Sequence, residues 1–254
     1  NYVEKEKIII PSHRLFEPEI FKNDEKINEI VNLISKSKKP IFYIGGGCIN
    51  SGPKASKLVT KFVEETKAPA TMTLMGLGVI GAKNKYSLGM LGMHGMYEAN
   101  MAMHECDVMI NIGARFDDRV TGRLDAFAPN SKKIHIDIDP SNINKTIKID
   151  VPIIGDIETV MNQVFLSWKN NNYKSQKEDL IKWWNKIEEW KKVDCLNYDQ
   201  GEGSIKPQHA IKRLYELTKD KKTFITTEVG QHQMWAAQYY KFEEPNRWLT
   251  SGGL

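Results

Sequence analysis

The fold is most strongly constrained by residues 40–47, which read PIFYIGGG. Four apolar residues follow Pro40, and such a short apolar run bounded by turn residues is typical of a buried strand. The three glycines that come next tolerate positive φ angles and a close approach of neighbouring backbones. Residues 40–47 therefore predict a buried strand that leads directly into a tight turn.

Helices and strands alternate on both sides of this predicted strand. Upstream, apolar residues at 27, 30, 31 and 34 have helical spacing, and Asn23 and Asp24 are candidate caps. Downstream, the pattern predicts helices around residues 58–63, 98–105 and 157–168, and strands at 70–74, 108–112 and 134–138. Strands that alternate with helices indicate an α/β fold. We predict a parallel, doubly wound sheet followed by the start of a second α/β domain.

The composition changes after residue 168, where three consecutive asparagines form a polar break. Residues 174–192 then place three tryptophans at helical spacing, which we assign to packing rather than to a ligand platform. A second α/β unit is expected from Ser204, with a helix buried through Ile211, Leu214 and Tyr215 and a strand at 224–227. The predicted divisions are an interdomain linker (1–26), a central domain (27–168), a linker with an amphipathic helix (169–203) and part of another domain (204–254).

Composition argues against several classes of protein. The chain has 36 Lys and Arg against 32 Asp and Glu residues, interspersed along its length, so nucleic acid is not an expected partner. The longest charge-free stretch of consequence, residues 68–82, is too short for a membrane span and contains proline and glycine, so no membrane association is expected. Three cysteines without CxxC spacing favour a reducing compartment over a disulfide framework or a zinc site. We expect a fragment of a longer protein, because the chain starts at Asn1 and ends in a glycine-rich turn.

Two segments that follow predicted strands suit phosphate groups. The glycines at 45–47 would let backbone amides approach a phosphate, although a plain tight turn explains them equally well. Arg115, Arg119 and Arg123 are four apart, so on one helical face they would suit a diphosphate. The alternative is a solvated helix whose arginines pair with Asp117 and Asp118.

Three further segments have an alternative structural reading. Asp137 and Asp139 end a predicted strand and suit ribose hydroxyls, or else cap the next helix. The apolar, glycine-punctuated residues 88–95 suit a flat aromatic ring, or else form a buried turn in which His94 is merely satisfied. Residues 228–234 suit a diphosphate, or else form a capped helix with exposed polar residues. Together the strand ends indicate a nucleotide cofactor.

Six motifs occur in a fixed order and are more specific together than any one of them. Over nearly its whole length the chain resembles the catalytic large subunit of the acetohydroxyacid synthase, or acetolactate synthase, family. The resemblance implies a central FAD-binding domain at 27–168, a linker, and part of a thiamine diphosphate domain at 204–254. The motifs are GGG (45–47), TLMGLG (73–78), LGMHG (91–95), GARFDDR (113–119), HIDIDP (135–140) and GQHQMW (230–235).

The same resemblance implies the residues that line FAD. Asp137 would lie on the adenosine side, and Met93 and His94 nearer the flavin. The full set comprises Gly46, Gly47, Thr73, Leu74, Leu91, Gly92, Met93, His94, Gly113, Arg115, Asp117, Arg119, Asp137, Ile138 and Asp156.

The resemblance also implies a thiamine diphosphate site and catalytic candidates. Gly230, Gln231 and His232 would meet thiamine diphosphate, and Met234 would face its reactive side. The catalytic candidates are Asp118, Arg119 and Met234, the first two facing the substrate channel. The family's activating glutamate and its Mg²⁺ ligands are expected outside this chain, so no metal ligand is assigned and the fragment alone is expected to be inactive.

The implied reaction joins pyruvate to a second pyruvate or to 2-ketobutyrate, giving 2-acetolactate or 2-aceto-2-hydroxybutyrate for branched-chain amino-acid biosynthesis. FAD would be mainly structural, because the net reaction has no redox step. A homodimer or homotetramer with a regulatory small subunit is implied, in the cytoplasm of a bacterium or in a plastid or mitochondrion of a eukaryote. The alternatives are a related thiamine diphosphate enzyme (pyruvate oxidase, glyoxylate carboligase or a coenzyme A decarboxylase) and a non-catalytic nucleotide-binding module.

Overall fold

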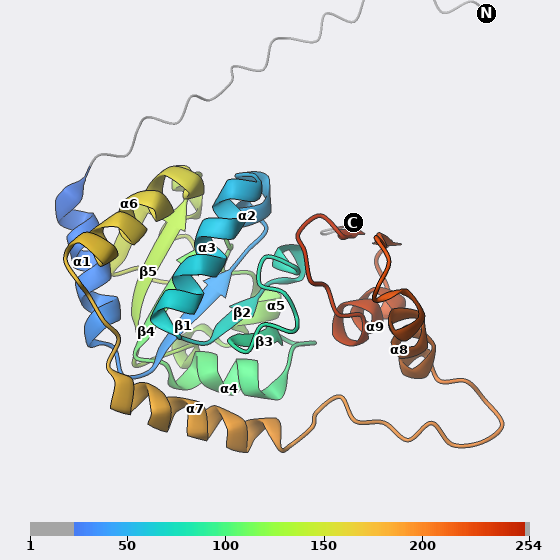
Figure 1. Ribbon diagram of the computed structural model, residues 1–254. Helices are drawn as coiled ribbons and strands as arrows, with labels where there is room; N and C mark the ends of the chain where they lie inside the picture. Colours follow the sequence, from blue (N-terminus) through green and yellow to red (C-terminus); the bar gives the residue numbers. More distant parts are fainter. Residues whose placement is uncertain (1–22, 252–254) are drawn as a thin grey trace, which may run out of the picture.

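A six-stranded parallel sheet forms the centre of the computed structural model, which describes residues 23–251 (Figure 1). The strand order is β3-β2-β1-β4-β5-β6, and every neighbouring pair is parallel. This arrangement confirms the predicted parallel α/β sheet. The strands are β1 (Pro40–Ile44), β2 (Ala70–Met72), β3 (Ser87–Met90), β4 (Val108–Ile112), β5 (Lys132–Asp137) and β6 (Val151–Ile154).

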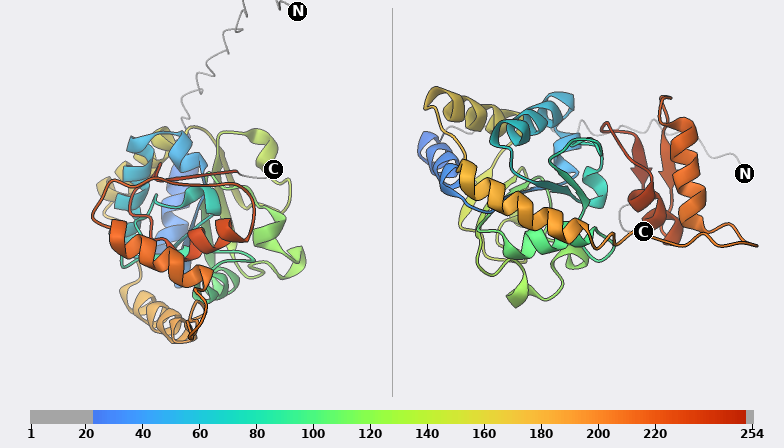
Figure 2. Two further views of the ribbon diagram at one scale, coloured as in Figure 1. Left: turned by 90° about the vertical axis from the view of Figure 1, so that its right-hand side faces the viewer. Right: turned by 60° about the horizontal axis from the view of Figure 1, so that its bottom comes forward.

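Helices cover both faces of the sheet (Figures 1 and 2). One face carries α1, α3 and α6, and the other carries α4 and α7. The helices of the sheet unit and the segment after it are α1 (Asp24–Lys36), α2 (Gly47–Asn50), α3 (Pro53–Thr66), α4 (Tyr97–Glu105), α5 (Asp118–Thr121), α6 (Ile157–Asn170) and α7 (Lys177–Lys191).

Strand β1 is buried along its whole length because it has a strand on each side and helices above and below. Phe42 and Ile44 pack in the core under α1, α3 and α6, whereas Ile41 and Tyr43 pack in the core under α4 and α7. Successive side chains of a strand point to opposite faces, so a strand covered on both sides must be apolar at every position. This explains why residues 40–44 carry no polar alternation.

Side chains cap the starts of two helices that cover the sheet. The Asn23 side chain accepts a hydrogen bond of 3.0 Å from the amide of Lys26, which confirms the expected start of α1. The carboxylate of Asp156 accepts one of 3.1 Å from the amide of Thr159 and caps α6. Each cap satisfies a backbone amide that has no partner within its helix.

Some predicted boundaries are wrong at the edges of the sheet. Strand β2 ends at Met72, and Leu74 begins a single 3-10 turn, so the predicted strand over 70–74 is too long. The predicted strand over 134–138 ends at Asp137, leaving Ile138 exposed. The pattern also missed β3 and β6. Both are edge strands with one neighbour, where Gly89 and Pro152 interrupt the apolar pattern without breaking an interior ladder.

Helix α7 packs on the face of the sheet that also carries α4. Trp183 is 2% exposed and its indole N–H donates a hydrogen bond of 3.1 Å to the carbonyl of Pro40. Ile187 is fully buried in the same cluster. The assignment of the tryptophan stripe to packing is therefore confirmed.

A second, smaller unit follows and contains a two-stranded parallel sheet. Its helix α8 is less buried than expected, since Leu214 is 42% exposed while Ile211 and Tyr215 are only partly buried. The predicted buried face of this helix is wrong in that respect. The elements are α8 (Pro207–Thr218), β7 (Ile225–Thr227), α9 (Gln231–Tyr239) and β8 (Trp248–Thr250).

The second unit lies against the segment that follows β2 (Figure 2). The amide of Ala82 donates a hydrogen bond of 3.0 Å to the carbonyl of Phe242. Gly78 adopts φ +93°, and a Cβ there would lie 2.2 Å from the carbonyl oxygen of Glu244. The two backbones therefore meet directly at a glycine. Of the helices in residues 23–251, none is long and apolar enough to cross a membrane.

Candidate functional site

A cavity of about 1120 Å³ lies between the carboxyl ends of the strands and the second unit. Open parallel sheets bind ligands at this edge. Loops after β1, β2, β3 and β4 line one side, and the start of α9 and the end of β8 line the other. The predicted residues that line it are Gly46, Gly47, Thr73, Leu74, Leu91, Met93, His94, Gly113, Arg115, Asp117, Asp118, Arg119, Gly230, Gln231 and Met234.

The glycine turn after β1 is required by close packing against the loop after β4. A Cβ on Gly45 would lie 2.1 Å from the carbonyl oxygen of Gly113, and one on Gly47 would lie 2.8 Å from the Cα of Gly113. The amide of Gly47 also donates a hydrogen bond of 3.0 Å to that carbonyl. The tight turn accounts for Gly45, while Gly46 and Gly47 in addition line the cavity.

The loop after β4 presents its arginines differently from the prediction. Helix α5 spans Asp118–Thr121 only, so Arg115 lies before it and Arg123 after it. The three arginines therefore do not share one helical face. The carboxylate of Asp117 caps α5 by accepting a 3.0 Å bond from the Arg119 amide, and Gly122 at φ +53° ends the helix after one turn. Only Arg115 and Arg119 line the cavity.

The path of this loop is fixed by buried side chains. Tyr43 donates a hydrogen bond of 2.9 Å from its hydroxyl to the carbonyl of Arg115. Burial raises the pKa of the Tyr43 hydroxyl, so the group stays neutral and remains a donor. Arg115 itself is exposed and forms a 3.3 Å ion pair with Asp117. A cationic side chain is thus held on a rigid backbone at the cavity wall.

The apolar loop after β3 forms another part of the wall. Met93 is 65% exposed and its side chain lines the cavity. The sulfur of Met93 lies 3.8 Å from the guanidinium of Arg119. The carbonyl of His94 accepts a hydrogen bond of 2.8 Å from Gln238 in α9, which ties the loop to the second unit.

Asp137 ends β5 outside the lining of this cavity. Its carboxylate accepts a 2.9 Å bond from the Asp139 amide and a 3.3 Å bond from the Asn142 side chain, and lies 3.5 Å from the ring of His135. Burial alone would raise the pKa of Asp137, but His135 and these hydrogen bonds outweigh it and hold the pKa below its usual value. Asp139 caps the next turn through the amide of Ser141, as the alternative reading expects.

Five of the predicted site residues do not line the cavity: Gly92, Asp137, Ile138, Asp156 and His232. The structure shows another place or role for three of these five residues. Gly92 sits behind Met93 with φ +101°, Asp156 caps α6, and the His232 ring packs back over Gly230.

Helix α9 begins at the cavity, as predicted. Gly230 is its N-cap, and Gln231 and Met234 face the cavity from its first turn. Behind them, the buried Gln233 donates hydrogen bonds to the Thr250 hydroxyl at 2.7 Å and to the Ser251 carbonyl at 2.8 Å. The positive end of a helix, with its free amides, favours an anionic ligand.

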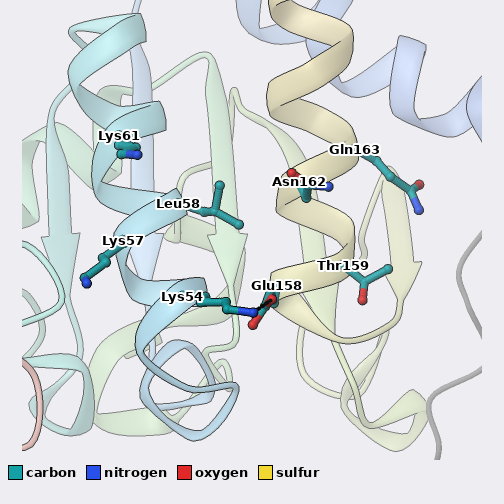
Figure 3. A pocket seen from close by; sticks show the side chains of 8 residues that line it. All are labelled: Lys54, Lys57, Leu58, Lys61, Glu158, Thr159, Asn162 and Gln163. Carbon is teal, nitrogen blue, oxygen red and sulfur yellow. Dashed lines mark ion pairs between the residues drawn. The ribbon is translucent and has the colours of Figure 1, made fainter.

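A second hollow of about 480 Å³ lies between α3 and α6 (Figure 3). Lys54 pairs with Glu158 across it at 3.6 Å. Its described lining includes none of the predicted site residues. In residues 23–251 no group of three or more His, Cys, Asp or Glu side chains is arranged to hold a metal ion.

Sequence reasoning missed several residues that build the site. Four of them bond to the backbone of cavity loops: Tyr43, Asn100, Asn111 and Gln238. The bonds of Tyr43 and Gln238 join distant parts of the chain, whereas those of Asn100 and Asn111 depend on a local turn. No motif marks them, because a single polar residue within a strand or helix has no distinctive spacing.

Comparison with known proteins places this geometry in context. Residues 27–164 match the family model described as thiamine pyrophosphate enzyme, central domain, and residues 228–254 match the model of the C-terminal TPP binding domain. The chain is 42% identical over 243 residues to the acetolactate synthase isozyme 3 large subunit of Escherichia coli, covering 96% of this chain and 42% of that protein. It is 45% identical over 234 residues to the chloroplastic acetolactate synthase of Arabidopsis thaliana, covering 91% and 34%. The chain thus spans about two-fifths of the bacterial relative's length.

Proposed function

Because the chain belongs to the thiamine pyrophosphate enzyme family, we propose that it is part of an acetolactate synthase large subunit. The observation that carries this proposal is the single cavity shared by the arginine loop after β4 and the start of α9. The two family models fall on the same two units, and the named relatives match nearly the whole chain. The reaction would join pyruvate to pyruvate or 2-ketobutyrate.

The cavity residues fit a flavin dinucleotide. Arg115 and Arg119 supply cations for a diphosphate, and Leu91 and Met93 supply an apolar surface for a flat ring. Gly46 and Gly47 leave no side chain between the backbone and a ligand. The volume of about 1120 Å³ exceeds the roughly 300–1,000 Å³ of ordinary small-molecule sites, which suits a large cofactor.

The first turn of α9 fits a second diphosphate. The amides at Gln231 and His232 point out of the helix start, where the helix dipole favours negative charge. Thiamine diphosphate, when bound, would supply the electron sink for decarboxylation of a 2-ketoacid. Met234 would cover its reactive side. Arg119 would pair with the ketoacid carboxylate, and Asp118 would face the substrate channel beside it. Mg²⁺ would be held by residues outside this chain.

We further propose an assembly in which the large subunit forms a homodimer or homotetramer and binds a regulatory small subunit. The location would be the cytoplasm of a bacterium, or a plastid or mitochondrion of a eukaryote.

The test uses the full-length parent. It should bind FAD, show a flavin absorption spectrum, and form acetolactate from pyruvate only with thiamine diphosphate and Mg²⁺. A parent that binds thiamine diphosphate but releases acetyl phosphate, or that forms tartronate semialdehyde from glyoxylate, would point instead to a pyruvate oxidase or a glyoxylate carboligase. A parent that binds a nucleotide without turnover of any 2-ketoacid would be a non-catalytic module.

A further inference from the structure

Two asparagines hold the backbone of two of the cavity loops, those after β3 and β4, in the same way. Asn111, in β4, accepts a hydrogen bond of 3.1 Å from the amide of Ala114 and donates one of 2.9 Å to the carbonyl of Ala114. Asn100, in α4, accepts one of 2.8 Å from the amide of Gly92 and donates one of 2.9 Å to the carbonyl of Gly92. In each case one side-chain amide satisfies both polar groups of one loop residue.

Such a two-point contact fixes the orientation of a loop as well as its position. Loop residues have no strand or helix partner for their amide and carbonyl groups. The asparagine side chain supplies the hydrogen bonds to these groups instead. Asn111 is fully buried, and its two bonds are shielded from water, whereas Asn100 is exposed. Removing the Asn111 amide would leave buried backbone groups unpaired, which is the more costly change.

The residues next to the held positions line the cavity. Arg115 directly follows Ala114, and Leu91 and Met93 lie on either side of Gly92. Asn111 therefore acts on a loop that carries a cation, and Asn100 acts on a loop that carries apolar side chains. The asparagines reach the cavity through the backbone and are not themselves among the described residues that line it.

We infer that Asn111 and Asn100 are positioning residues for two parts of a flavin dinucleotide, the diphosphate and the flavin ring, a statement that rests on the proposed function. Asn111 sets the loop that presents Arg115 to the diphosphate. Asn100 sets the loop that presents Leu91 and Met93 to the flavin ring. The two asparagines thus contribute to different parts of one ligand.

The experiment compares FAD with ADP, which has the diphosphate and adenosine but no flavin. Dissociation constants are measured on the full-length parent and on Asn111→Ala and Asn100→Ala by titration calorimetry. Asn111→Ala should weaken FAD and ADP binding alike, by about tenfold. Asn100→Ala should weaken FAD binding by roughly three- to tenfold and leave ADP binding within about twofold.

Matched controls separate positioning from general destabilisation. Asn84→Ala removes an amide whose oxygen accepts a 3.0 Å bond from the amide of Tyr86 in a turn away from the cavity, and should leave both affinities unchanged. Melting temperatures without ligand are recorded for every variant. Should Asn111→Ala fail to fold, Asn111→Ser keeps a hydroxyl for one of the two bonds and is expected to show a smaller parallel loss.

The outcomes distinguish the two proposals. A wild-type parent that takes up no flavin refutes the proposed function. A parent that binds FAD while the Asn100 variant binds FAD as well as the wild type, or loses FAD and ADP equally, refutes the positioning role of Asn100. Unchanged binding in the Asn111 variant refutes that of Asn111.

Discussion

The backbone amide of Met93 donates a hydrogen bond of 2.8 Å to the carbonyl oxygen of Arg119. This bond joins the loop after β3 to helix α5, two segments of the cavity wall that are separated by α4 and β4 in the chain. The adjacent Gly92 has φ +101°, and a Cβ there would lie 2.7 Å from the same carbonyl oxygen. The two segments therefore depend on each other, and a side chain at residue 92 would separate them.

Gly92→Ala should destabilise the protein and weaken flavin binding. The substitution adds backbone strain of about 1 to 3 kcal/mol and a clash with the Arg119 carbonyl. Thermal unfolding and FAD titration of the parent measure both effects. Gly203→Ala is the matched control, since Gly203 has φ +91° and nothing within 4 Å of the added Cβ. Equal effects of the two substitutions would show that the close contact at Gly92 is unimportant.

Arg115→Ala should weaken flavin binding by roughly 10- to 150-fold, because it removes a charge-assisted contact worth about 1.5 to 3 kcal/mol. Flavin content after gel filtration and a dissociation constant from fluorescence quenching measure the loss. Arg123→Ala serves as control, because Arg123 pairs with Asp125 at 2.7 Å and is not among the described lining residues. If both variants retained FAD equally, the diphosphate would have to lie elsewhere.

His232→Ala should raise the thiamine diphosphate concentration needed for half-maximal activity by roughly tenfold while flavin content stays unchanged. The His232 ring packs over Gly230, the N-cap of α9, so its removal should loosen the helix start whose amides favour a diphosphate, while the flavin loops lie far away in the sequence. Activity titrations of the parent with thiamine diphosphate supply the measurement. His209→Ala removes an imidazole from α8 in the same unit and should change neither quantity. Loss of FAD with an unaltered thiamine diphosphate requirement would mean that the two sites have been exchanged.

Glu98→Gln should raise the melting temperature at pH 7. Burial raises the pKa of the Glu98 carboxyl, with Glu188 and Asp194 adding to the shift and its own backbone amide and Lys191 opposing it. A folded-state pKa above the unfolded value means that Glu98 favours folding at low pH and loses that contribution as pH rises through the folded pKa. The advantage of the variant should therefore shrink as pH falls toward the ordinary Glu pKa of about 4.3. Glu202→Gln, at an exposed position, should show no such trend; a pH-independent difference at Glu98 would contradict the assignment.

The centre of the fold could be predicted from the sequence, whereas its edges could not. Strand β1 and the cap at Asn23 follow from local rules, since an apolar run and a capping side chain act within a few residues. Strand β3 contains Gly89 at φ +73°, and β6 contains Pro152, so each lacks the pattern of a buried strand. Their pairing is fixed by one neighbouring strand and by no local signal.

The loops that form the site could be predicted from the sequence, but the arrangement of their side chains around the cavity could not. The motifs located the strand-end loops correctly, because glycines and charged residues after apolar runs are visible in the sequence. The face shared by three arginines was wrong, since the Asp117 cap and Gly122 limit α5 to one turn. Which of the residues reach the cavity depends on long-range bonds such as that from Tyr43 to Arg115, which spacing alone does not encode.

Gly78 meets Glu244 backbone to backbone, and neither residue is among the described residues that line the cavity. A side chain at residue 78 would overlap the carbonyl oxygen of Glu244, so the second unit would have to move away from the segment after β2. The spacing between the two sides of the cavity would then change even though every residue of its lining stays the same. The width of the cavity therefore depends on a contact between residues outside its described lining, and a screen for altered ligand size should include residues 78 and 244.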